Sequence, residues 1–241
     1  MSAPTPASQD SPPWRRHGRE ALSVWRLGMA RLLPRWWQLL LVVGIGAALV
    51  LAVGNGGGWD DQILQRVRQP DNNALTQTAK SLSFWGDTIW AALLALVLFA
   101  VGVKFGCPRW RQIAWACLLA ALISGIVVNI FRPTLGRARP YASLPGEFHG
   151  PSLNTAYQGF PSGHATSAFA SAAAVAAASP LIGAPCLIFA GSVGWSRLQL
   201  NKHHPLDVMT GAALGSLIGL CFGSAVQGSK FQMRRKKRAR L

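Results

Sequence analysis

The sequence predicts an all-α membrane protein, a bundle of six transmembrane helices, from its composition and its apolar stretches. Half of the 241 residues are hydrophobic and only 13% are charged, whereas a soluble domain is about a quarter charged. A helix needs about 20 mostly apolar residues to cross a hydrocarbon core roughly 30 Å thick. Six apolar stretches between residues 36 and 226 are candidates for such helices.

Three of these candidate spans are clear and three are weaker. The clear ones are residues 36–53, 88–105 and 113–130. The weaker ones are residues 164–178, 185–195 and 206–226. The stretch 164–178 consists mostly of Ala and Ser, which transfer poorly into lipid but pack closely against other helices. We therefore expect this helix to lie inside the bundle.

Proline and glycine refine the last two spans. Pro180 and Pro185 bracket a predicted short turn before the fifth span. Gly211, Gly215 and Gly219 recur every fourth residue on one face of the sixth span, a pattern typical of helices that approach closely. We call these three residues the glycine stripe and expect another helix to pack against it.

Basic residues predict the orientation, because cytoplasmic segments of membrane proteins are enriched in Lys and Arg. Residues 1–35, expected to be partly disordered before Trp14, hold six arginines, and the tail 227–241 holds seven basic residues. Both termini are therefore predicted to be cytoplasmic, with loops 132–164 and 197–207 on the periplasmic or extracellular face. The formal charge of +16 follows from this topology and does not indicate a nucleic-acid partner. A bacterial inner membrane is the expected location of the membrane domain, residues 36–226.

Two outer loops have predicted features of their own. Trp59, Ile63, Leu64 and Val67 recur at an approximately helical spacing, which favours a short helix on the membrane surface or, less simply, a gate that admits lipid. Residues 139–161 contain several glycines and prolines and are expected to be irregular, in a position to cover a site.

Polar residues concentrate in three short motifs near predicted helix ends. They are Arg132-Pro133-Thr134-Leu135-Gly136-Arg137-Ala138-Arg139-Pro140, Pro161-Ser162-Gly163-His164, and a stretch from Ser196-Arg197 to His203 and Asp207. Ionisable groups at membrane depth are costly without a function. Histidines, a carboxylate and arginines are the groups needed to hold a phosphate, attack it and protonate the leaving oxygen. The motifs therefore predict phosphatase chemistry.

The second motif suits an anion. Ser162 is a natural N-cap, and the amides of Gly163 and His164 would then point out of the helix start, where the helix dipole also favours negative charge. The protonated imidazole of His164 would lie beside the phosphate and could protonate the leaving oxygen.

In the third motif, Pro205 suits the first position of a helix, with His204 as its cap. Asp207 then lies in the first turn, where its carboxylate can accept a hydrogen bond from one ring nitrogen of His203. That contact would fix the tautomer and leave the other nitrogen free to attack phosphorus.

In order and internal spacing, the three motifs resemble those of the type 2 phosphatidic acid phosphatase (PAP2) superfamily, which includes the vanadium haloperoxidases. The resemblance covers roughly residues 80–226 and implies a helical bundle of the PAP2/haloperoxidase type. It implies that His203 is the nucleophile and forms a phosphohistidine, that His164 is the general acid, and that Asp207 orients His203. The residues implied to bind the phosphate are Arg132, Arg139, Ser162, Gly163 and Arg197. The family usually has Lys at the position of Arg132, and Arg keeps the charge but changes its reach and hydrogen-bond geometry.

Other polar residues near the motifs receive simpler interpretations. Arg137 is expected to face solvent or lipid headgroups. A role for Lys202 or Asp87 is left open, and His17 and His149 are expected to be ordinary loop residues.

No metal, cofactor or disulfide is expected. The chain lacks Cys-x-x-Cys and His-Glu-x-x-His patterns, and the cations around His203 and Asp207 would repel a divalent ion. None of the four cysteines lies in a predicted outer loop; they are Cys107, Cys117, Cys186 and Cys221.

The sequence thus predicts a metal-independent phosphatase that acts on a phospholipid or polyprenyl phosphate at the membrane. Candidate substrates are undecaprenyl diphosphate, phosphatidate, phosphatidylglycerol phosphate and lipid A. The same site could instead pass the phosphoryl group to a second lipid, as a phosphotransferase, and an inactive scaffold or transporter is a third possibility. The oligomeric state stays open.

Overall fold

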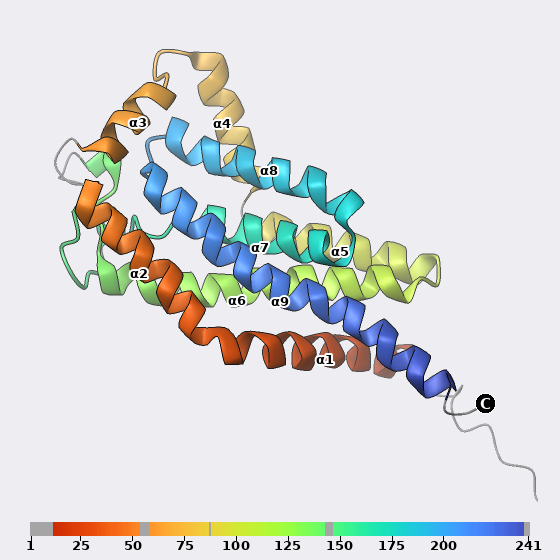
Figure 1. The fold of residues 1–241 in the computed structure, drawn as a ribbon. Coiled ribbons are helices and arrows are strands. Elements are labelled where there is room, and N and C mark those ends of the chain that lie inside the picture. Colours follow the sequence, from red (N-terminus) through yellow and green to blue (C-terminus); the bar gives the residue numbers. More distant parts are fainter. Residues whose placement is uncertain (1–11, 54–57, 87, 143–146, 239–241) are drawn as a thin grey trace, which may run out of the picture.

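The computed structural model of the protein describes residues 12–53, 58–86, 88–142 and 147–238. In these ranges the regular structure is helical, apart from an isolated bridge between Arg137 and Phe148. The α-helices of Figure 1 are α1 (Pro13–Leu32), α2 (Trp36–Val53), α3 (Trp59–Val67), α4 (Asn73–Trp85), α5 (Thr88–Lys104), α6 (Pro108–Leu135), α7 (Gly163–Ala178), α8 (Pro180–Gln199) and α9 (Pro205–Arg238). Short 3₁₀ helices occur at Leu33–Arg35, Pro140–Ala142 and Thr155–Tyr157.

Each of the six predicted spans coincides with a helix, namely α2, α5, α6, α7, α8 or α9. By length and composition, four helical stretches in the described residues could cross a membrane: Arg15–Val53, Pro108–Leu135, Pro180–Gln199 and Pro205–Gln227. The stretch Ala91–Lys104 is apolar but shorter. The protein is therefore an all-helical membrane protein, while the count of six spans stays a prediction.

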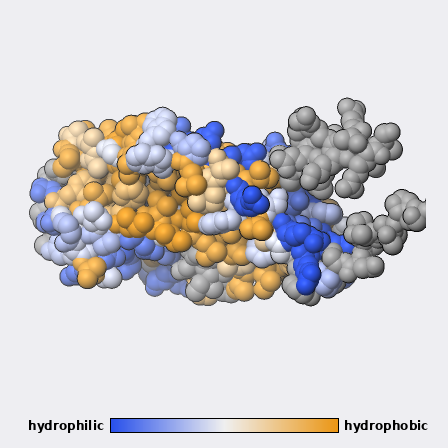
Figure 2. All heavy atoms as spheres, turned by 90° about the horizontal axis from the view of Figure 1, so that it is seen from below, coloured by the Kyte–Doolittle hydropathy of each residue, from blue (hydrophilic) through white to orange (hydrophobic). Residues whose placement is uncertain are grey.

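The surface agrees with this assignment, because large apolar side chains point outward from the helices. Exposed examples on α2 and α8 are Trp36, Leu41 and Ile188. Figure 2 shows hydrophobic surface along the helices, with hydrophilic side chains gathered toward the two ends.

Helix α7 lies in the interior, between α6, α8 and α9 (Figure 1). Its alanines are mostly buried, and the glycine stripe of α9 packs directly against its backbone. A Cβ atom added to Gly215 would lie 2.1 Å from the carbonyl oxygen of Thr166, and one added to Gly219 would lie 2.3 Å from that of Ala170. Both predictions, the interior helix and the packing stripe, are confirmed.

The predicted turn between Pro180 and Pro185 is wrong. Helix α8 begins at Pro180 and continues through Pro185. Proline is well tolerated at the first helical position, where its missing N–H costs nothing. Pro185 lies only one turn further on, so the helix loses few backbone hydrogen bonds.

Two helices were not predicted. Helix α1 joins α2 through the 3₁₀ turn Leu33–Arg35, so the basic N-terminal segment is helical from Pro13. Helix α4 is capped by Asn72, whose side-chain oxygen accepts a hydrogen bond from the Leu75 amide at 3.0 Å. The predicted short helix is present as α3, whereas residues 1–11, for which disorder is predicted, lie outside the described residues.

Candidate active site

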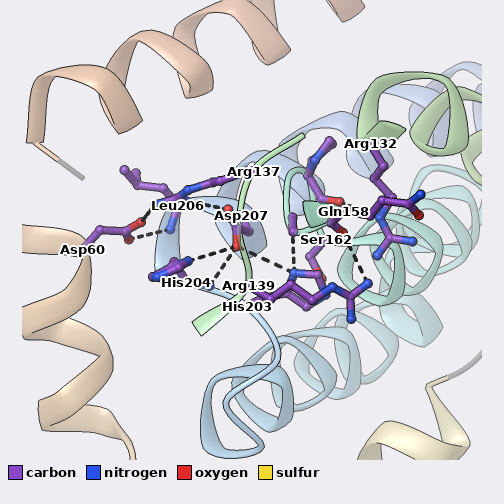
Figure 3. A network of polar contacts seen from close by, with 12 residues as sticks. Asp60, Arg132, Arg137, Arg139, Gln158, Ser162, His203, His204, Leu206 and Asp207 are labelled. Carbon is purple, nitrogen blue, oxygen red and sulfur yellow. Dashed lines mark hydrogen bonds and ion pairs between the residues drawn. The ribbon is translucent and has the colours of Figure 1, made fainter. Parts of the chain in front are cut away.

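The three motifs meet at one end of the bundle, where α7 and α9 begin and α6 and α8 end (Figures 1 and 3). Helix α3 lies at the same end (Figure 1). Side chains far apart in the sequence thus share one polar centre.

His203 is fully buried in the connection between α8 and α9. Its Nδ1 lies 2.7 Å from the carbonyl oxygen of Gly159, and a carbonyl can only accept, so Nδ1 carries the hydrogen. The other nitrogen, Nε2, is buried and has no hydrogen-bond partner. Burial, together with the nearby charges of Arg132 and Arg139, lowers the pKa of the His203 imidazole to about 3, although Asp207 acts in the opposite direction. The ring is therefore neutral, with a free electron pair on Nε2.

Asp207 lies in the first turn of α9, as predicted, but its contact with His203 is longer than a hydrogen bond. Its Oδ2 lies 3.7 Å from Nδ1 of His203 and accepts a hydrogen bond from the backbone N–H of His204 at 2.8 Å. The Gly159 carbonyl, rather than Asp207, is thus the direct acceptor that fixes the His203 tautomer. The sequence analysis missed this carbonyl, because a backbone acceptor has no side-chain signature.

Three arginines come together from different elements. Nε of Arg132, in the last turn of α6, donates to the Pro161 carbonyl at 3.1 Å. Nη2 of Arg139 donates to the Gln158 carbonyl at 3.2 Å, and Arg197, at the end of α8, donates to the hydroxyl of Ser83. Arg139 and Arg197 lie close enough for their charges to act on Arg132. Like charges repel one another, so the centre favours an anion.

The start of α7 completes this centre. Ser162 occupies the N-cap position of α7, as predicted, but its hydroxyl makes no capping bond and is buried without a partner. The guanidinium of Arg132 lies over Gly163, where an added Cβ would be 2.9 Å from Nη1 of Arg132. His164 follows in the first turn. A donor hydroxyl, a helix N-terminus and the guanidinium of Arg132 therefore lie together, and each of these groups favours an anion.

Arg137 does not face solvent or headgroups, which corrects the prediction. It is fully buried, with 2.5 Å between its Nη1 and Oδ1 of Asp207 and 2.7 Å between its Nη2 and Oδ2 of Asp60 (Figure 3).

Lys202, Asp87 and His149 were also singled out in the sequence. Lys202 places its ammonium 4.5 Å from the ring centre of Tyr141. Asp87 lies outside the described residues, and the exposed His149 packs edge-on against Tyr157. Across the described part of the chain, no three His, Cys, Asp or Glu side chains are grouped to hold a metal ion.

Comparison with known proteins identifies a family for this arrangement. The family model of the PAP2 superfamily matches residues 113–230, which include all three motifs. A lipid A 1-phosphatase of Rhizobium etli is 28% identical over 167 residues, which are 61% of this chain and 69% of that protein. The undecaprenyl-diphosphatase BcrC of Bacillus subtilis is 29% identical over 128 residues, which are 53% of this chain and 65% of that protein.

A solved structure has the same fold. The transmembrane PAP2 type phosphatidylglycerolphosphate phosphatase of Bacillus subtilis superposes with a TM-score of 0.59. The match covers 81% of this chain and 95% of that one at 21% identity.

Proposed function

The chain belongs to the PAP2 superfamily of phosphatases, and we propose that it hydrolyses the terminal phosphate of a membrane lipid through a phosphohistidine intermediate. The observation that carries this proposal is the state of His203. Its Nδ1 hydrogen is held by Gly159, and its buried Nε2 has no hydrogen-bond partner, with Arg132 and Arg139 close enough for their charges to act on the ring.

In the first step, the electron pair of His203 Nε2 forms a bond to phosphorus while the bond from phosphorus to the lipid oxygen breaks. His164, at the start of α7, gives its proton to the departing oxygen. Arg132, Arg139 and Arg197 neutralise the nonbridging oxygens, and the hydroxyl of Ser162 and the amide of Gly163 donate hydrogen bonds to them. The lipid leaves with one phosphate fewer.

In the second step, water attacks the phosphohistidine. His164, now unprotonated, takes a proton from the water, and the bond from phosphorus to Nε2 breaks as inorganic phosphate forms. His203 returns to the tautomer held by Gly159. Asp207 stabilises the positive charge that develops on the ring during both steps.

A lipid substrate fits the surroundings of the site. The centre lies at the end of an apolar bundle, so a substrate with its tail in the bilayer could place its headgroup there. The relatives are named for lipid A, undecaprenyl diphosphate and phosphatidylglycerol phosphate. These lipids and phosphatidate are the substrate candidates for this chain.

The proposed topology has six spans, both termini in the cytoplasm and the site on the outer face of a bacterial inner membrane. It is supported by the charge distribution of the sequence, since loops facing the cytoplasm are enriched in Lys and Arg. Six helices coincide with the predicted spans. An even number of spans places the site on the side opposite the termini.

The test is phosphate release by detergent-purified protein, with EDTA present, across the four lipid classes. Release from one class that disappears in His203→Ala would support the proposal and identify the substrate. The matched control is His149→Ala, which removes an exposed histidine and should release phosphate as the unchanged protein does. Loss of phosphate from the donor lipid only when a second lipid is added would favour a phosphotransferase instead.

A further inference from the structure

A buried ion network connects α3 to the start of α9. Arg137 bridges the carboxylates of Asp60 and Asp207. The second oxygen of Asp60, Oδ1, accepts a hydrogen bond from the backbone N–H of Leu206 at 2.9 Å. The three charged side chains are fully buried, and Figure 3 shows them side by side next to the histidines.

Both carboxylates hold the same turn of chain. Asp60 accepts one guanidinium N–H and the N–H of Leu206, while Asp207 accepts one guanidinium N–H and the N–H of His204. Because Oδ1 of Asp207 is occupied by Arg137, Oδ2 is the oxygen that faces His203. The orientation of this carboxylate therefore depends on Arg137.

Arg137 also supports His203 through its backbone. The Gly159 amide donates to the Arg137 carbonyl at 2.9 Å, and the Gly159 carbonyl accepts from His203 at 2.7 Å. A single residue thus supports both acceptors that face Nδ1 of His203.

The charges of the network explain the need for Asp60. Burial alone would lower the pKa of Arg137, but the two carboxylates raise it above its usual value, so the guanidinium stays charged. The three side chains carry −1, +1 and −1, so the network contributes a net charge of −1 beside the His203 ring, opposite in sign to Arg132 and Arg139. Without Asp60, Arg137 would neutralise Asp207 alone, and the ring would lose this stabilising field.

We infer that Asp60 and Arg137 are positioning residues of the active site. Arg137 holds Asp207 and Gly159 against His203, and Asp60 balances the charge of Arg137. Helix α3, which carries Asp60, lies before residues 113–230, the part of the chain that matches the family model. Through Asp60, this helix nevertheless supports the active site. The inference rests on the proposed function only for the role of His203 as the nucleophile.

The first test is Asp60→Asn, which keeps the shape of the side chain and removes its charge. We expect kcat to fall about 10- to 100-fold, the scale associated with a misplaced reacting group. KM should change little, because Asp60 contacts none of the phosphate-binding arginines in the described structure. The matched control is Asp71→Asn, which changes an exposed carboxylate between α3 and α4 and should leave kcat unchanged. Wild-type kcat in Asp60→Asn, or a lower folded fraction with unchanged kcat per folded molecule, would overturn the inference.

The second test is a double-mutant cycle with Arg137→Met. That change leaves two buried carboxylates uncompensated, a costly state, whereas Asp60→Asn with Arg137→Met restores the net charge of −1. The double variant should therefore be more stable and more active than Arg137→Met alone. Additive losses in the cycle would contradict the charge balance.

A third measurement does not depend on turnover. NMR spectra of protein labelled with ¹⁵N-histidine report the tautomer of each imidazole ring. The His203 signals are assigned by their absence from the spectrum of His203→Ala, and they should show a ring protonated at Nδ1. Asp60→Asn should shift its signals or mix its tautomers, and Asp71→Asn should not. An unchanged His203 spectrum in Asp60→Asn would overturn the inference, whether or not the unchanged protein releases phosphate. If the spectrum shifts as expected but the unchanged protein releases no phosphate from any lipid, the result counts against the proposed function alone.

Discussion

The carbonyl oxygen of Gly159 lies 2.7 Å from Nδ1 of His203 and accepts its hydrogen. This contact makes a backbone group, contributed by the segment before the second motif, the direct determinant of the His203 tautomer. In the proposed mechanism, Nε2 of His203 is available for attack on phosphorus only while that segment keeps its position. The Gly159 segment is in turn held by the Arg137 carbonyl.

Gly159→Ala should therefore impair catalysis. Its new Cβ would lie 2.9 Å from the Arg137 carbonyl oxygen and 3.2 Å from that of Ala138, so the segment must shift. We expect about 10- to 100-fold less phosphate release and a loss of about 1–3 kcal/mol in the free energy of unfolding. Gly125→Ala, where an added Cβ meets nothing within 4 Å, is the control in both assays. Unchanged release by Gly159→Ala would show that the carbonyl does not set the tautomer.

The buried His203 predicts a dependence of stability on pH. Its pKa is about 3 in the folded protein and about 6.5 in an unfolded chain. As the pH falls below about 6.5, the unfolded state therefore binds a proton that the folded state does not, and stability is lost toward lower pH at up to about 1.4 kcal/mol per pH unit.

The measurement is thermal unfolding in detergent between about pH 6.5 and 5, a range above the usual carboxyl pKa values. His203→Gln removes the titrating group, so its melting temperature should fall less steeply with decreasing pH than that of the unchanged protein. Parallel curves for the two proteins would mean that His203 is not buried in its neutral form.

Arg132 offers a test of the proposed phosphate-binding residues. Arg132→Ala should lower kcat/KM by about 10²- to 10³-fold, the cost of removing one strong donor from a transition state. Arg132→Lys keeps the charge but loses the bond from Nε to the Pro161 carbonyl, so it should retain more activity than Arg132→Ala. Equal activity of the Ala and Lys variants would exclude a charge contact with the phosphate.

Much of the fold could be predicted because apolar length is a local property of the sequence. The helices that escaped prediction lack long apolar runs: α1 carries several arginines, and α4 contains Thr, Gln, Lys and Ser. The turn at Pro185 was wrong because proline near a helix start is tolerated. Hydropathy reports which segments avoid water, and it does not report which polar segments are helical.

The site was predictable to the extent that its residues lie in compact motifs at helix ends. His203, Asp207 and the motif arginines belong to such motifs, and they meet in the structure. Asp60 could not be found in this way, because it pairs with Arg137 across 77 positions and with Leu206 across 146. Contacts of that separation depend on the packing of α3, which no local pattern encodes.

The glycine stripe predicts that alanine at Gly215 and alanine at Gly191 differ in their effects on the free energy of unfolding and on phosphate release. At Gly215 an added Cβ would lie 2.1 Å from the carbonyl oxygen of Thr166, a backbone atom of α7 that cannot move aside without displacing the helix. Gly215→Ala should therefore lower the free energy of unfolding by about 1–3 kcal/mol or more. Because Ser162 and His164 lie at the start of α7, displacement of α7 should also reduce phosphate release.

Gly191→Ala is the matched change on an open surface of α8, where an added Cβ meets nothing within 4 Å. Alanine in a helix interior is favoured over glycine by about 0.5–1 kcal/mol, so this variant should be as stable as the unchanged protein or slightly more stable. Thermal unfolding and phosphate release of both variants give the comparison. The backbone N–H of Ser162 donates to the Asp207 carbonyl at 2.9 Å. If Gly215→Ala matched Gly191→Ala in both assays, α7 and α9 could not be in the close contact that this bond requires.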